Sequence, residues 1–330
     1  MPFAGRITHG RDVRTAIRIL MVLWCLALIP PALAPNLITF ALTLAVFGAT
    51  AGLADVAMNA QGVAVEQRAG RSIMSGLHGM WSVGGLVASG FGVLAASLGV
   101  DAPVHFAIAA AALAVISIVA SGRLLRVHAE TEDHGPVFAL PPRPVVLIAL
   151  VAFAAIFAEV ASMDWSALDL TDVAHAPPGI AAAAYSGFAA TMAVSRLVGD
   201  RVVDRLGRVR AVRYGGIAAT AGAVVVAAAR TPALAIAGFA LIGIGVAVVV
   251  PLAFTAAGNA GPRPAHQIAG VATISYGAGL MAPAIIGGIA QVTSLSVSFL
   301  VVALLAAMIV LGAPTLDPSR RSDIRVASEI

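Results

Sequence analysis

Ten long apolar runs, separated by short polar connections, constrain the fold of this chain more than any other feature. A helix of roughly 20 apolar residues crosses the hydrocarbon core of a bilayer. The runs lie at 15–34, 37–63, 73–98, 102–122, 145–168, 179–199, 211–229, 232–257, 267–291 and 296–313. Only 11% of the residues are charged, whereas a soluble domain carries about 25%. The sequence therefore predicts an all-α membrane protein with ten transmembrane helices.

The kinds of ionisable residue present exclude several classes of function. All twenty basic residues are arginines, and a nucleotide-binding P-loop requires a lysine. The arginines lie in short loops rather than on one soluble face, which argues against binding of nucleic acid. Zinc-hydrolase and serine-hydrolase patterns, H-x-x-x-H and G-x-S-x-G, are absent. We therefore expect no enzyme, no cofactor and no bound metal.

The distribution of arginine predicts the orientation of the chain in the membrane. With the amino terminus in the cytoplasm, nineteen of the twenty arginines fall on the cytoplasmic side and only Arg230 falls outside. Short cytoplasmic loops are enriched in positive charge. This bias predicts that both termini are cytoplasmic and that the number of spans is even.

The longest polar stretch predicts a division of the chain. Residues 123–143 contain several acidic residues and a Pro-Pro pair, and we interpret them as a cytoplasmic linker. The linker separates an amino-terminal bundle of four helices, 1–122, from a bundle of six helices, 144–313. Residues 314–330 would form a cytoplasmic tail.

An internal repeat supports two related halves. A shift of 195 positions aligns helices two and three with helices eight and nine. The aligned pairs are Gly48 with Gly243, Arg68 with Arg263, Trp81 with Tyr276, Gly84 with Gly279, and Gly92 with Gly287. Parallel repeats of this kind occur in major facilitator transporters. On this pattern the first half is two helices short.

One loop carries a more specific resemblance. Gly199 precedes Asp204-Arg-Leu-Gly-Arg208, which resembles the D-R-x-G-R signature between the second and third helices of each half of major facilitator transporters. The resemblance implies that Gly199, Asp204, Arg205, Gly207 and Arg208 form a conformational latch. Residues 5–14 look like a worn copy of this loop, and we therefore expect the first two helices to be missing.

A second resemblance concerns residues 55–66 and 77–82. These stretches look like the equivalent part of a poorly characterised subgroup of bacterial inner-membrane transporters, some named by analogy with sugar permeases. The resemblance implies a secondary transporter that moves a small polar solute by alternating access. The acidic residues Glu159 and Asp55 within the spans make the proton a candidate coupling ion, with symport as a candidate mode. We expect a monomer in the bacterial inner membrane, surrounded by lipid. Drug efflux is disfavoured, because the antiporter proline is absent between Gly84 and Gly92.

An alternative from another class stays open. A chain without its first two helices could act as a truncated, non-transporting sensor or scaffold in the membrane. In-frame apolar runs upstream of Met1 in the DNA would favour the transporter.

Ionisable groups within the spans are the candidates for a solute or proton pathway, because each costs about 2.5–3.5 kcal/mol to insert. Asp55 and Asn59 lie one turn apart, and His78 reaches a similar depth in the next helix. Together with Trp81 they predict a polar site, although an interhelical hydrogen-bond cluster explains Asn59 and His78 equally well.

The second half contributes further candidates. Glu159 lies past the midplane of its helix and is the best candidate for proton coupling. Asp164 belongs either to the pathway or to an outer capping pair, and the adjacent Trp165 is an interfacial anchor. Arg196 is expected to reach the lipid headgroups or to pair with Asp200. Glycines and prolines in helices eight and nine predict gate helices, represented by Pro251, Gly279 and Pro283.

Overall fold

The computed structural model describes residues 13–125, 143–261 and 264–317, and in these ranges every regular element is helical. The elements are α2 (Val13–Ala27), α3 (Ile29–Ala32), α4 (Leu37–Ala69), α5 (Met74–Ser97), α6 (Ala102–Ser121), α7 (Arg143–Asp172), α8 (Pro178–Leu206), α9 (Arg208–Ala228), α10 (Pro232–Val246), α11 (Val249–Gly258), α12 (Pro264–Val292), α13 (Leu295–Gly312) and the short 3-10 helix η1 (Ala313–Leu316). The predicted linker and tail lie largely outside the described residues.

The helices confirm the all-α membrane fold. Within the described residues, eight stretches are long and apolar enough to cross a membrane, with α2 and α3 forming one of them and α10 and α11 another. The other two predicted spans correspond to α5 and α8, of 24 and 29 residues. Both lengths suffice to cross the hydrocarbon core. Each of the ten predicted apolar runs is therefore helical.

Several helices extend beyond the predicted ends of their apolar runs, among them α4, which continues from the run at 37–63 to Ala69. The run at 145–168 lies within α7, which continues to Asp172. The run at 179–199 lies within α8, which continues to Leu206. Hydropathy marks the thickness of the hydrocarbon layer, whereas backbone hydrogen bonds continue into the polar region. Four aspartates therefore lie on helices rather than in loops: Asp169, Asp172, Asp200 and Asp204.

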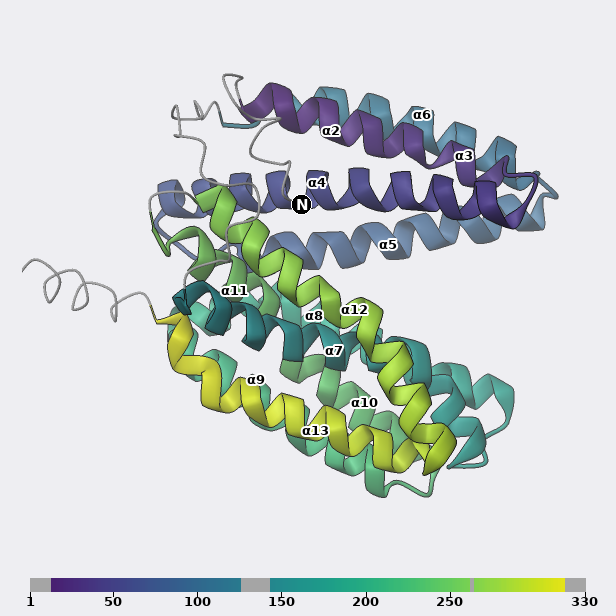
Figure 1. Cartoon of the computed structure of the whole chain (residues 1–330), viewed down its shortest axis with the longest axis vertical. Helices are drawn as coiled ribbons and strands as arrows, with labels where there is room; N and C mark the ends of the chain where they lie inside the picture. Colours follow the sequence, from purple (N-terminus) through teal and green to yellow (C-terminus); the bar gives the residue numbers. More distant parts are fainter. Residues whose placement is uncertain (1–12, 126–142, 262–263, 318–330) are drawn as a thin grey trace, which may run out of the picture. The chain divides into compact units, whose positions relative to one another are not determined.

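The chain forms two compact units. The first comprises Met1–Ala69 and Val83–Leu140, and the second comprises Gly70–Ser82 and Pro141–Ile330. In the first unit α2 packs against both α4 and α6 (Figure 1). Its small buried cluster contains Ile17, Leu20 and Ala54. The beginning of α5 thus belongs to the second unit, although the rest of that helix belongs to the first.

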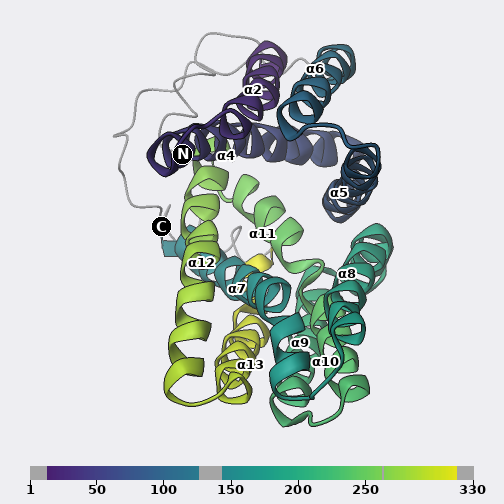
Figure 2. The same cartoon turned by 90° about the vertical axis from the view of Figure 1, so that its right-hand side faces the viewer.

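In the second unit α7 is the central helix, and it contacts α8, α10, α11, α12 and α13 (Figure 2). Its alanines explain this position, because Ala149, Ala152 and Ala155 are fully buried and let neighbouring helices approach closely. Glycines do the same between α9 and α10. A Cβ atom on Gly222 would lie 2.7 Å from the carbonyl oxygen of Gly238.

This close approach predicts a stability difference between two glycine substitutions. Gly222→Ala should lower the free energy of unfolding by about 1–3 kcal/mol, because its methyl group would overlap the backbone of α10. Gly48→Ala is the matched control, since nothing lies within 4 Å of its Cβ position and alanine is the better helix former by about 0.5–1 kcal/mol. Thermal unfolding in detergent measures both. Equal midpoints for the two variants would contradict the packing of α9 on α10.

Candidate functional site

A buried ion pair joins α7 to α8 in the second unit. Nη2 of Arg196 lies 3.0 Å from Oε2 and 3.2 Å from Oε1 of Glu159. The arginine side chain is 7% exposed and the glutamate side chain 20%. Charges removed from water in this way require a partner of opposite sign and further hydrogen bonds.

A break between α10 and α11 provides the next partner of Arg196. Pro251 has no N–H group and therefore cannot donate to the carbonyl of Ala247, four residues earlier. The helix is interrupted there, since α10 ends at Val246 and α11 begins at Val249. Nε of Arg196 donates to the freed Ala247 carbonyl oxygen at 3.4 Å. The proline predicted to mark a gate helix thus creates an acceptor for the buried cation.

The beginning of α5 completes the site. Nη1 of Arg196 donates to Oγ of Ser82 at 3.4 Å, and Oγ of Ser75 donates to the backbone carbonyl of Arg196 at 2.8 Å. We call Arg196, Glu159, Ser82 and the Ala247 carbonyl the Arg196 site. Four separate helical segments of the second unit meet there.

Aromatic rings extend this arrangement from α5 to α12. The ring of His78 is stacked on Phe254 of α11, with centroids 6.0 Å apart. Phe254 in turn makes an edge contact with Tyr276 of α12 at 6.4 Å. Phe254 is fully buried, whereas His78 and Tyr276 are partly exposed, so only these two rings could contact a solute.

Asp200 binds the first turn of α5. Its Oδ1 accepts from the backbone N–H of Ser75 at 2.9 Å, and its Oδ2 accepts from that of Gly76 at 2.7 Å. The carboxylate therefore satisfies two free donors at a helix end where negative charge is favourable. Gly199 permits the close approach of α8 to α5, because a Cβ atom there would lie 3.0 Å from Cβ of Ser75.

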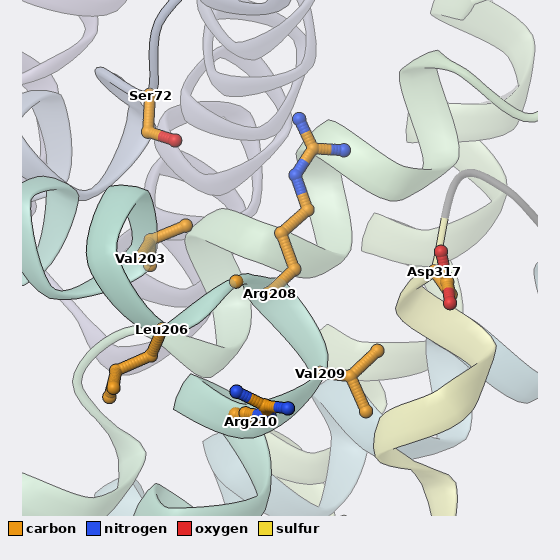
Figure 3. A pocket seen from close by; sticks show the side chains of 8 residues that line it. Ser72, Val203, Leu206, Arg208, Val209, Arg210 and Asp317 are labelled. Atoms are coloured by element: carbon orange, nitrogen blue, oxygen red, sulfur yellow. The ribbon is translucent and has the colours of Figure 1, made fainter.

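Two of the predicted latch residues, Gly207 and Arg208, line a shallow pocket next to this junction. Asp204 is exposed and accepts from the backbone N–H of Ser72 at a long 3.4 Å. Gly207 has a φ of 79°, a conformation that favours glycine, and it separates α8 from α9. The pocket has a volume of about 460 Å³. Figure 3 shows Arg208 and Arg210 on its wall, together with Asp317.

The other residues predicted to line the solute or proton pathway are not members of the Arg196 site. Asp55 and Asn59 lie in the first unit, where Nδ2 of Asn59 donates to the Asp55 carbonyl at 2.9 Å. His78 lies in the second unit, so the predicted grouping of the three remains a prediction. Trp81 and Asp164 are exposed.

The remaining predicted residues belong to the end of α8 and to α12. Arg205 is exposed in the last turn of α8. The gate residues Gly279 and Pro283 lie within α12, which is continuous from Pro264 to Val292.

Sequence reasoning missed two residues of this region. The expectation that Arg196 reaches the lipid headgroups is wrong, because the residue is buried and bound to Glu159. Asp200 was considered only as its partner. A signal was present: an arginine well inside a span, and a proline whose fourth preceding carbonyl needs a donor.

The amino-acid sequence matches a described family and several bacterial proteins. Residues 1–282 match the profile of the Major Facilitator Superfamily. An uncharacterized MFS-type transporter of Yersinia pestis is 40% identical over 307 residues, covering 92% of this chain and 79% of the relative. An uncharacterized transporter of Sinorhizobium fredii is 33% identical over 319 residues, covering 96% and 84%.

Solved structures show the same fold at low sequence identity. The fucose:proton symporter of Escherichia coli has a TM-score of 0.77 at 15% identity, covering 96% of this chain and 87% of that one. A human organic anion transporter has a TM-score of 0.74, also at 15% identity, with 96% and 80% covered.

The contact of Asp200 with α5 predicts a change in accessibility. A single cysteine at Ser75, in a Cys25→Ala background, should react slowly with a maleimide because Ser75 is 2% exposed. Asp200→Ala removes two charged hydrogen bonds, each worth about 1.5–3 kcal/mol, and should raise the labelling rate about tenfold or more. Asp204→Ala is the control, since its bond to Ser72 is long. Equal rates in the two variants would refute this role of Asp200.

Proposed function

Because this chain belongs to the major facilitator superfamily, a family of membrane transporters rather than enzymes, we propose that it couples transport of a small polar solute to protons. In this proposal the solute moves by alternating access, in symport with the proton. The protein acts as a monomer in a bacterial inner membrane, with both termini in the cytoplasm. The buried pair of Glu159 and Arg196 carries the proposal.

The pair supports coupling because neither charge can remain buried alone. Removing one partner from a buried ion pair costs about 3–5 kcal/mol. Separation therefore requires that a proton neutralise Glu159 and that another acceptor compensate Arg196. A solute hydroxyl or carboxylate, or water in an open cavity, could be that acceptor. Binding of proton and solute would then favour the same conformational change.

The Arg196 site also lies near helices that can bend, as alternating access requires. The α10–α11 break at Pro251 and the proline in α12 provide helical segments that can bend. We propose these as gates, and the rings of His78 and Tyr276 as a wall of the solute pathway. Asp55, Asn59, Trp81 and Asp164 remain proposed members of this pathway.

The latch is proposed to act through the beginning of α5. Gly70–Ser82 is held by Asp200 in the second unit, yet it is continuous with α4 and with the rest of α5 in the first. Release of the two hydrogen bonds would free this segment to move with the first unit. Gly199, Asp204, Arg205, Gly207 and Arg208 would adjust the strength of the contact.

Glu159→Gln should abolish coupling. Folded protein is first screened by thermal shift with glucose, fucose, alanine and succinate, because a bound ligand raises the midpoint. Proteoliposomes loaded with a pH-sensitive dye then report proton entry when the stabilising compound is added. We expect entry in the wild type and a loss of at least about tenfold in Glu159→Gln, since an amide cannot take up the proton.

The control for this experiment is Asp172→Asn, an exposed carboxylate at the end of the same helix. It should retain proton entry. Unchanged solute-driven proton entry in Glu159→Gln would refute the assignment of Glu159.

The same pair predicts a non-additive effect on stability. Arg196→Gln alone should lower the free energy of unfolding by about 3–5 kcal/mol, because Glu159 would be left without its partner. The double variant Glu159→Gln, Arg196→Gln should recover a large part of that loss. Additive losses, measured by thermal unfolding in detergent, would show that the two charges do not depend on each other.

A further inference from the structure

We propose that Asp169, near the end of α7, is a proton-binding site separate from Glu159, and that its carboxyl group is neutral in the conformation described here. Asp169 is 1% exposed. Both of its carboxylate oxygens are buried without a hydrogen-bond partner among the described residues. An ionised carboxylate in such surroundings is strongly disfavoured, and it takes up a proton instead.

Asp169 shares its face of α7 with two other polar side chains. Ser166 and Trp165 lie three and four residues earlier, on the same face of α7. Ser166 Oγ and Trp165 Nε1 are also buried without a hydrogen-bond partner in the described structure, so neither donor is engaged by the carboxylate. The ring of Trp165 packs closely against α12, where a Cβ atom on Gly287 would lie 2.9 Å from its Cη2.

Few charges act on this carboxyl group. Of the helices that contact α7, α10, α11 and α13 contain no ionisable side chain, and α12 contains only His266 and Tyr276. In the first four turns of α8 the only ionisable residue is Tyr185. The interacting charges are those of Arg230 and Asp172.

Neither of these two charges compensates a buried carboxylate. The Arg230 side chain is exposed, and its Nη1 donates to the Ala229 carbonyl at 2.8 Å and to Ser296 Oγ at 3.2 Å. Solvent therefore screens its attraction. Asp172 is exposed and has the same sign as Asp169, which adds repulsion. A proton is the ligand that neutralises the site, because the described residues contain no group of three acidic, histidine or cysteine side chains that could hold a metal ion.

The position of Asp169 gives the proton a short route. The residue lies in the last turn of α7, where Asp172 is exposed. The chain then leaves the helix through His175, whose φ of 53° is unusual for a side-chain-bearing residue. Opening of this end would hydrate the carboxyl group and release its proton to water. The role in coupling rests on the proposed function, whereas proton binding itself can be measured without solute or transport.

The test is thermal unfolding of the full chain in detergent between about pH 5 and about pH 8.5. In the wild type the folded form keeps a proton that an unfolded aspartate has released, so the midpoint should fall by at least about 3 °C as the pH rises. Asp169→Asn should lose this component and be more stable than the wild type at the higher pH. Asp172→Asn, the matched control, should keep it.

Three results would overturn the proposal. The first is an equal pH dependence in Asp169→Asn and the wild type. The second is a lower midpoint of Asp169→Asn at every pH, which would indicate a favourable ionised partner. The third is a midpoint raised by sodium chloride over choline chloride in the wild type but not in Asp169→Asn, which would identify a sodium site.

If Asp169→Asn does not fold, Asp169→Leu provides a second test. Leucine has a similar size and no polar atoms, and a site that holds a neutral group should tolerate it. If both variants failed to fold, the ionised carboxylate would be required for the structure and the proposal would be rejected. Loss of the infrared band of a protonated carboxyl group in a folded variant would support it. Because no solute is present, failure of the Glu159 experiment leaves this result unaffected.

Discussion

The arrangement of the second unit depends on one buried cation. Arg196 cannot remain in the protein interior without acceptors on every side, and each acceptor comes from a different segment of the chain. Glu159 provides a carboxylate from α7, Ala247 a carbonyl from the break after α10, and Ser82 a hydroxyl from α5. Because all of these acceptors must surround one guanidinium group, the buried charge fixes where the segments meet.

The break in the eighth predicted apolar run, between α10 and α11, leaves a backbone carbonyl that the buried charge can use. Pro251 removes one backbone donor, and in lipid an unsatisfied carbonyl would be costly. The guanidinium of Arg196 fills that vacancy. The guanidinium thus donates to the carbonyl that the proline leaves without a donor. In turn, that carbonyl is one of the acceptors that the buried guanidinium requires.

Two aspartates show how the surroundings of a carboxyl group decide what it can do. Asp200 accepts two backbone N–H bonds at a helix start and is stabilised as an anion. Asp169 accepts none among the described residues and is only 1% exposed. Residues of one type, on adjacent helices, therefore suit different roles: a releasable contact in one case and a proton site in the other.

The sequence by itself determined the class of the protein, because hydropathy over 20 residues measures the thickness of a bilayer and needs no knowledge of tertiary contacts. It also determined the family, through Asp204-Arg-Leu-Gly-Arg208 and its neighbours, and it indicated Glu159 as an acidic residue within a span. Only the tertiary structure decided that Arg196 is the partner of Glu159, that Asp200 binds the start of α5, and that Asp169 is buried. These contacts join residues 37 to 125 positions apart, or depend on packing around a helix end. The physical reason is that a charge in a helix reveals a need for a partner, whereas the identity of that partner depends on how helices distant in sequence pack together.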